Sequence, residues 1–312
     1  MKFKNMFSPI QIGPMTVKNR FVVPPMGNNF ANSDGTWSDE SVAYYGERAK
    51  GQFGLITIEA TVVHKGAKGG PKKPCLYDDN SIESLKKITD ACHEEGAKVS
   101  IQLQNAGPEG NAKNAGAPIQ AATAIASADG RDIPEEVSTE KVYELVKGYG
   151  EAAERAMKGG ADAVEIHMAH GYLVNSFMSP RTNKRVDEFG GNFENRMRFS
   201  RLIIEEVKKK TEGKIAVLAR INSTEDMFGG LDNHDMCAVA SYLEDCGIDG
   251  LHVSRAVHLK MSICGLRQEF TADSQQSLLQ ISRNVFLFRL LQLEDIQNHS
   301  LQNRSLKWEM QI

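Results

Sequence analysis

The stretch "DAVEIHMAHGYLVNSFMSP" (Asp162–Pro180) opens with a short apolar run and continues into a loop that holds two histidines and a tyrosine. The run follows a long amphipathic segment that stops at glycine, which predicts a buried strand after a helix. His167 ends that strand, and His170 and Tyr172 lie in the loop after it. Polar residues gathered directly after a buried strand are typical of the functional edge of an α/β domain.

Apolar runs of strand length alternate with helix-like segments on both sides of this stretch. The expected strands cover residues 20–26, 54–60, 97–104, 162–168, 214–222 and 250–254, and the expected helices cover residues 38–50, 81–96, 138–160, 192–213 and 232–247. Strands that are apolar on both faces, with helices between them, form a parallel sheet covered by helices. Six such units, with no GxGxxG motif after the first strand, favour a (β/α) barrel over a doubly wound dinucleotide-binding sheet.

The two ends of the chain differ from this pattern. Residues 8–20, "SPIQIGPMTVKNR", are expected to form a hairpin that turns at Gly13 and Pro14. Gly265 is the sole glycine after residue 260, and no strand–helix–strand pattern follows it, although a closed barrel needs eight strands. We therefore predict an α/β fold in which residues 1–260 form an incomplete (β/α)8 TIM barrel with six recognisable strands. An atypical tail over 261–312, helical around 274–296, is expected to follow.

Composition excludes several classes of partner. The formal charge is -3, and the five cysteines are scattered without a CxxC pair. A near-neutral charge argues against nucleic acid or an anionic membrane as a partner, and no run reaches the roughly 18 apolar residues of a membrane-spanning helix. Scattered cysteines are typical of reduced thiols. We therefore expect a cytoplasmic protein that acts on a small molecule, and the sequence leaves a homo-oligomer open.

Two hypotheses explain the polar residues at the strand ends. In the first, His167 and His170 bind a metal ion, and Glu165, which shares a strand face with His167, supplies a third ligand. An HxxH pair alone is weak evidence for such a site. This hypothesis predicts a metal-dependent barrel lyase or hydrolase.

In the second hypothesis, the same edge binds a flat polar heterocycle such as isoalloxazine. Gln102 can donate and accept a hydrogen bond at once, and Arg220 places positive charge where a reduced flavin gains negative charge. His167 and His170 then donate hydrogen bonds to a substrate carbonyl, and Tyr172 supplies a proton. This set predicts reduction of a carbon–carbon double bond conjugated to a carbonyl.

Structural roles compete with these assignments. Gln102 is equally suited to satisfy a buried backbone group, and Arg220 to form an ion pair with Glu165. Residues 179–191, "SPRTNKRVDEFGG", are expected to close over the top of the barrel as a structural loop. The charged residues expected to pin this loop are Arg181, Arg185 and Asp187.

Five stretches of the sequence resemble the old yellow enzyme family of flavin-dependent ene reductases. They are "FSPIQIGPMTVKNRFVVPPMG", "AKGQFGLITIEATVV", "VSIQLQNAG", "GGADAVEIHMAHGYLVNSFMSPRTNKRVDEFGGNFENRMRF" and "VLARIN". The similarity is greater to the branch with 2,4-dienoyl-CoA reductase, 2-enoate reductase and bile-acid 3-oxo-acyl-CoA desaturase-like proteins, and it covers residues 1–260. The resemblance implies an NAD(P)H:flavin oxidoreductase that binds FMN at the barrel mouth and reduces an enone or enoyl-CoA substrate.

The resemblance also implies a role for each residue at the strand ends. The residues implied to bind FMN are Pro25, Met26 and Gly27 along the ring, Ala60 and Gln102 at its pyrimidine edge, and Arg220 at N1 and O2. The catalytic residues implied are His167 and His170, which hold the substrate carbonyl, and Tyr172, which donates the proton. Two positions depart from the family, since Gly27 stands where some relatives carry Thr or Cys near flavin O4, and Asn105 stands where many carry His.

The resemblance stops before the end of the chain. Longer relatives continue with two further barrel strands, an iron–sulfur cluster and an FAD domain, none of which this sequence encodes. Loops after strands 7 and 8 usually hold the cofactor phosphate in such barrels. We therefore expect a C-terminally truncated barrel that binds FMN weakly or not at all, uses NADH or NADPH as reductant and holds no metal. The alternative from a different class is a catalytically inactive barrel.

Overall fold

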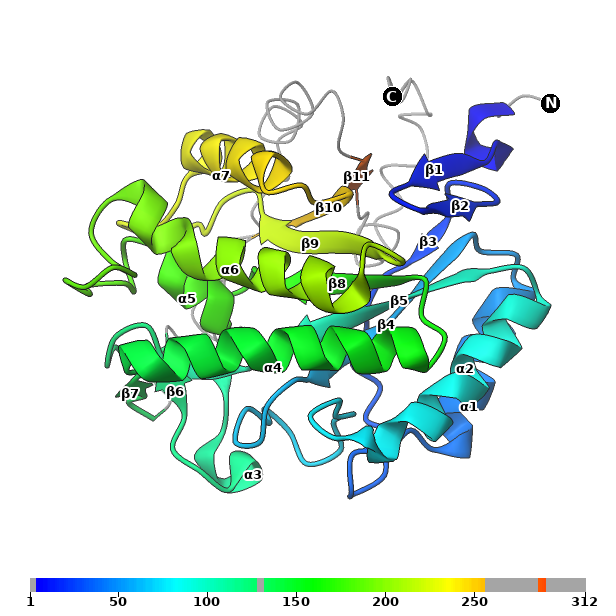
Figure 1. Ribbon diagram of the computed structural model, residues 1–312, viewed down its shortest axis with the longest axis horizontal. Helices are drawn as coiled ribbons and strands as arrows, with labels where there is room; N and C mark the ends of the chain where they lie inside the picture. Colours follow the sequence, from blue (N-terminus) through cyan, green and yellow to red (C-terminus); the bar gives the residue numbers. More distant parts are fainter. Residues whose placement is uncertain (1–3, 128–131, 256–285, 290–312) are drawn as a thin grey trace, which may run out of the picture.

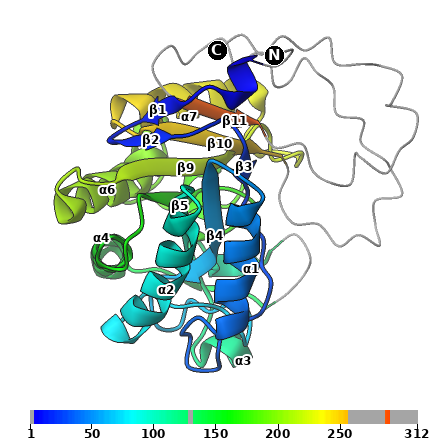
Figure 2. The ribbon, with the colours of Figure 1, turned by 90° about the vertical axis from the view of Figure 1, so that its right-hand side faces the viewer.

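A computed structural model of the protein describes residues 4–127, 132–255 and 286–289 (Figure 1). Parallel strands form one curved sheet in the order β11-β10-β9-β8-β5-β4-β3. Helices cover its outer face, with α4 and α6 side by side (Figures 1 and 2). The strand bounds are Val22–Val23 (β3), Leu55–Val62 (β4), Lys98–Gln104 (β5), Ala163–His167 (β8), Ala216–Asn222 (β9), Gly250–Ser254 (β10) and Phe286–Arg289 (β11).

Five long helices lie between these strands in the chain. They are α1 (Asp39–Lys50), α2 (Ile82–Glu94), α4 (Thr139–Lys158), α6 (Phe193–Thr211) and α7 (Asn233–Asp245). The short elements are η1 (Lys4–Phe7), β1 (Ile10–Ile12), β2 (Met15–Val17), η2 (Asp79–Ser81), η3 (Gly107–Glu109), α3 (Ala112–Ala115), β6 (Gln120–Ala121), β7 (Glu135–Glu136) and α5 (Leu173–Met178).

The curved parallel sheet confirms the predicted incomplete α/β barrel, and each of the six expected strands is present. The first strand is shorter than expected. Pairing with β4 is confined to Val22 and Val23, because Pro24 and Pro25 have no backbone N–H to donate to a strand ladder. The chain from Pro24 to Asn28 therefore leaves the ladder and has no regular secondary structure.

The predicted helix over 274–296 is wrong for the part that the structure describes. Phe286–Arg289 form β11, which pairs in parallel with β10 from Gly250↔Phe286 to Val253↔Arg289. A short apolar run does not distinguish a strand from a helix by its pattern. The unpaired backbone groups at the edge of β10 favour the strand. The rest of the predicted tail lies outside the described residues.

The helices α1, α4 and α6 begin where the sequence supplies a cap, whereas Ser81 at the start of α2 makes no side-chain cap hydrogen bond. Ser38, Ser138 and Asn192 each accept a hydrogen bond from the backbone N–H three residues later, at the starts of α1, α4 and α6. Each of these caps satisfies a backbone donor that the helix cannot satisfy itself. The caps fix where each helix starts after the strand before it.

The N-terminal hairpin forms as predicted and closes one end of the sheet. Strands β1 and β2 pair antiparallel, and the turn between them contains Gly13 with a φ of 51°. Its buried side chains pack against residues at or near the beginnings of the barrel strands. This cluster contains Ile12, Met15, Val17, Leu55, Ala163, Ala216 and Leu218. The opposite, carboxyl-terminal edge of the sheet therefore remains for a functional site.

A second and larger core lies between the sheet and the helices, and its fully buried side chains include Tyr149, Phe177 and Phe199. Among the described residues no helix is both long and apolar enough to span a membrane. The described cysteines, Cys75, Cys92, Cys237 and Cys246, are free thiols, and Cys264 lies outside the described residues.

The loop over residues 179–191 is pinned by Arg185 and Asp187, as expected, whereas Nε of Arg181 has no hydrogen-bond partner among the described residues. Arg185, whose side chain is 4% exposed, pairs with Asp187 and also donates to the backbone oxygens of Ala122 and Val137. Thr139 donates a hydrogen bond of 2.7 Å to Asp187. These bonds lower the pKa of Asp187 to about 2, with Arg185 as the largest cause. The loop is thereby tied to the start of α4.

Asp187→Asn should lower the stability of the folded chain at neutral pH and have a much smaller effect at about pH 2. The folded pKa lies below the unfolded one, so ionised Asp187 stabilises the fold above its unfolded pKa and loses that effect as pH falls toward about 2. A hydrogen bond to a charged group contributes about 1.5–3 kcal/mol. Urea unfolding at both pH values measures the difference. Glu188→Gln is the matched control, and an equal loss in both variants would contradict the assignment.

Candidate active site

A buried polar layer lies inside the curve of the sheet. Glu165 on β8 is 1% exposed. Its Oε1 accepts a hydrogen bond of 2.6 Å from Nε2 of Gln102 on β5. Its Oε2 lies 2.7 Å from Nδ1 of His252 on β10. Strand β9 separates β8 from β10 in the sheet, so Glu165 and His252 can meet only on its concave face.

The charge of this layer is balanced around Glu165. Burial alone would raise the pKa of Glu165, but His252, Arg220 and Gln102 outweigh burial and hold this pKa below its usual value. Burial also lowers the pKa of Arg220. In the described residues, Nε of Arg220 and Nε2 of His252 are buried and have no hydrogen-bond partner. Such donors and acceptors are suited to a polar ligand at this edge.

Gln102 and Arg220 differ from the structural roles that the sequence left open. Among the described hydrogen bonds, the amide of Gln102 contacts the side chain of Glu165 and not a backbone group. The positive charge of Arg220 lowers the pKa of Glu165. Among the described residues, however, the ion pair that Glu165 forms within 4.0 Å is with His252 and not with Arg220. The contact with His252 was missed from sequence, because that residue lies on a strand far along the chain. Its position near the end of an expected strand was the available signal.

Three aromatic side chains converge where β8 ends. The ring centroids lie 5.0 Å apart for His167 and His170 and 4.6 Å apart for His167 and Tyr172. The ring centroids of His170 and Tyr172 are 6.3 Å apart. The structure therefore brings together the three residues that the sequence analysis selected as catalytic. His167 pairs in register with Arg220 on β9, so the cluster adjoins the polar layer.

The ends of the neighbouring strands hold this loop in place. His170 has a φ of 63°, in the left-handed region that is unfavourable for residues other than glycine. Its backbone N–H donates to Oδ1 of Asn222 at the end of β9. Its Nε2 lies 2.7 Å from Oγ of Ser254 at the end of β10. Asn222 and Ser254 therefore position His170, and neither had been assigned this role from sequence.

The residues proposed to line the ring occupy the edge beside these strands. Pro25 is buried, whereas Met26 is 57% exposed and Gly27 is also exposed. Ala60 is partly exposed and lies where β4 shifts register against β5, between Ile58 and Thr61. Such a bulge changes the direction of side chains at the end of a strand. Accessible backbone here and unpartnered polar atoms inside the sheet fit the polar edge of a flavin.

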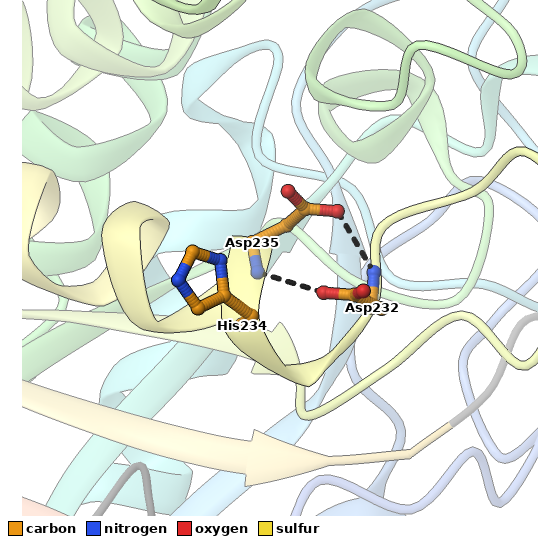
Figure 3. A group of neighbouring side chains, drawn as sticks. All are labelled: Asp232, His234 and Asp235. Atoms are coloured by element: carbon orange, nitrogen blue, oxygen red, sulfur yellow. Dashed lines mark hydrogen bonds between the residues drawn. The ribbon is translucent and has the colours of Figure 1, made fainter.

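The metal hypothesis fits the geometry less well. Glu165, its expected third ligand, is already bound by Gln102 and His252. Within the described part of the chain, the three side chains whose ligand atoms lie close enough together to hold a metal ion are those of the exposed residues Asp232, His234 and Asp235 (Figure 3). Asp232 and Asp235 form the capping box of α7 through reciprocal hydrogen bonds of 2.9 and 3.1 Å. The cap explains this group without an ion.

Fold and site together define a flavin-dependent oxidoreductase built on an α/β barrel. The chain belongs to the NADH:flavin oxidoreductase / NADH oxidase family, whose model matches residues 5–304. It is 38% identical over 263 residues to the NADPH dehydrogenase of Bacillus subtilis (strain 168), covering 83% of this chain and 76% of that protein. The family match extends past residue 260, where the sequence analysis expected the resemblance to end.

Solved structures agree with this assignment. The structure of Old Yellow Enzyme from Pichia sp. AKU4542 matches with a TM-score of 0.79 and 26% identity, over 96% of this chain and 80% of that one. A complex of 2-naphthoyl-CoA reductase with 2-naphthoyl-CoA matches with a TM-score of 0.79 and 30% identity, over 82% of this chain. This chain spans 41% of the length of that reductase.

Replacing Glu165 or His252 singly by leucine should destabilise the chain by about 3–5 kcal/mol each, because each change leaves a buried polar or charged partner unpaired. Replacing both should cost less than the sum of the two, by about 0.5–3 kcal/mol. Urea unfolding of the three variants measures this coupling. Ser200→Ala is a buried polar control on α6, outside the layer. Additive losses would show that the 2.7 Å contact contributes no coupling.

Proposed function

We propose that this chain reduces α,β-unsaturated carbonyl compounds, with His167, His170 and Tyr172 as the catalytic residues. FMN is the family's cofactor, and when bound it would supply the hydride transfer between NADH or NADPH and the substrate. The observation that carries the proposal is the convergence of two imidazoles and a phenol at the end of β8, next to Arg220.

The residues of the polar layer are suited to the flavin ring. The amide of Gln102 donates to Glu165 through Nε2, which leaves its oxygen as an acceptor for a ligand N–H. Arg220 supplies a positive charge that stabilises negative charge on a reduced ring. The backbone of Pro25, Met26 and Gly27, together with Ala60, would contact the ring. The described sheet has a seventh strand, β11, beside β10, and the loss of the phosphate site with strands 7 and 8 stays a prediction.

The substrate carbonyl would lie against the two imidazoles. A neutral imidazole donates through one nitrogen only. Nε2 of His170 lies 2.7 Å from Oγ of Ser254, and a hydroxyl that donates to Nε2 leaves the ring proton on Nδ1 for the carbonyl. His167 and His170 would then stabilise negative charge on the carbonyl oxygen, and Tyr172 would protonate the α-carbon. Water exclusion by the buried loop residues strengthens these hydrogen bonds.

The substrate class is an enone or an enoyl thioester. The similarity to 2-naphthoyl-CoA reductase supports the thioester, because that structure contains an acyl-CoA with a conjugated carbonyl. The family resemblance of the sequence points to the same class. The metal-dependent lyase or hydrolase is the weaker proposal, because Glu165 is engaged within the polar layer.

Tyr172→Phe should slow transfer to the enoyl substrate by roughly 10²–10⁴-fold, which is the usual effect of removing a general acid. Flavin reduction by NADH or NADPH should stay nearly unchanged, because that step needs no proton from Tyr172. Stopped-flow absorbance of each half-reaction, with the full chain and excess FMN, separates the two. Tyr143→Phe, an exposed tyrosine on α4, is the control. Equal losses in both half-reactions would contradict the assignment of Tyr172.

His167→Ala and His170→Ala should each cost about 2.7–4 kcal/mol of transition-state stabilisation, as for the loss of an oxyanion donor. The double variant should also lose the charge-transfer absorbance band that a phenol forms with oxidised flavin. Titration of the flavin-loaded chain with a phenol measures this band. His234→Ala, at the exposed cap of α7, is the control. A stoichiometric metal ion released by the double variant would support the metal hypothesis instead.

A further inference from the structure

Lys73 occupies the space that a side chain at position 27 would fill. A Cβ atom built on Gly27 would lie 2.7 Å from Nζ of Lys73 and 3.8 Å from Oε2 of Glu59. The first of these distances is shorter than real Cβ contacts allow, so a side chain at this position would require the flexible end of Lys73 to move. The backbone of Gly27 is not left-handed, so its conformation does not itself require glycine. The missing side chain is therefore what allows the ammonium group to approach this point.

Glu59 anchors this ammonium group from inside the sheet. Its side chain is fully buried, and its Oε2 lies 3.4 Å from Nζ of Lys73, whose side chain is 21% exposed. The backbone N–H of Asn28 donates to the same oxygen at 3.3 Å. The second oxygen, Oε1, is buried and has no hydrogen-bond partner among the described residues. An unpartnered buried acceptor beside an ammonium group suggests that a polar ligand completes the site.

The strand bulge explains how Glu59 comes to this place. Strand β4 shifts register against β5 between Ile58 and Thr61, so Glu59 and Ala60 leave the regular alternation of the strand. Tyr45 also holds Glu59, since the backbone N–H of Glu59 donates to the tyrosine hydroxyl at 3.0 Å. The carboxylate of Glu59 is thus held beside the backbone of the chain at position 27.

We propose that Lys73 sets the reduction potential of the bound flavin, acting in place of a side chain at position 27, with Glu59 as its positioning residue. The inference rests on the proposed function, in which the backbone of Gly27 faces the ring. A cation at this edge favours the reduced flavin, because reduction adds negative charge to the ring. Neither Lys73 nor Glu59 is among the residues that the sequence analysis selected.

The protonation of Glu59 agrees with this role. Burial raises the pKa of Glu59, although Lys73 and the backbone of Asn28 act in the opposite direction. Lys73 thus lies beside a buried carboxylate whose ionisation burial opposes and Lys73 favours.

The midpoint potential of the bound flavin tests the proposal, measured with the full chain and excess FMN. Lys73→Met should lower the equilibrium constant for two-electron reduction by about tenfold, which corresponds to about 30 mV. Glu59→Gln should raise it, because it removes the compensating negative charge. Lys73→Arg, which keeps the charge, is the control and should change it least. Opposite shifts in the first two variants support the proposal, since general damage to the site would move both in one direction. Unchanged potentials, or shifts of the same sign, overturn it.

A second measurement tests the shared space without flavin. Gly27→Ala should lower the stability of the wild-type chain more than that of a Lys73→Ala variant. The change in the unfolding equilibrium constant should be at least about threefold larger when Lys73 is present. An equal effect in both backgrounds overturns the claim that Lys73 fills this space. A chain that binds no FMN overturns the proposed function and this role together. Bound FMN with unchanged potentials overturns this inference alone.

Discussion

The carboxylate of Glu165 is the interaction on which the site depends. It joins Gln102 on β5 to His252 on β10, while itself standing on β8. Three strands of the sheet are thereby linked through one buried group that is 1% exposed. Such a group is costly to bury unless both of its oxygens are satisfied. The two contacts of 2.6 and 2.7 Å satisfy them and fix the orientation of Gln102 at the ligand-facing edge.

The loop after β8 is held by the same strands that carry the polar layer. His167 ends the strand that carries Glu165, and Asn222 and Ser254 hold His170 from the ends of the next two strands. The cluster of His167, His170 and Tyr172 and the polar layer therefore share β8, β9 and β10 as one support. On our proposal, a displacement of these strands would alter ring binding and carbonyl binding together. This coupling explains why the polar residues lie on several strands instead of one loop.

Features that depend on local pattern were predictable from the sequence. The hairpin turn at Gly13 and the strand ending at His167 were both expected and are present. The contact between Glu165 and His252 was not predictable, because it forms only when the sheet curves and brings β8 and β10 to the same concave face. The approach of Lys73 to Gly27 was also missed from the sequence. Lys73 pairs with Glu59, which lies in the bulge of β4, and this irregularity has no signature in the sequence pattern. The strand at Phe286–Arg289 was mistaken for a helix because a neighbouring edge, and not its own pattern, determines its structure.

The carboxyl-terminal edge of this sheet, on our proposal, binds the ring of FMN through the polar layer. Titration of the full chain with FMN, followed by quenching of flavin fluorescence, tests this binding most directly when wild type is compared with Gln102→Leu. We expect saturable quenching at one site per chain, and affinity at least about tenfold lower in the variant, because a lost hydrogen bond at a buried edge costs about 1–3 kcal/mol. Equal affinity in the two proteins, or no saturable binding in wild type, would contradict this role of the polar layer.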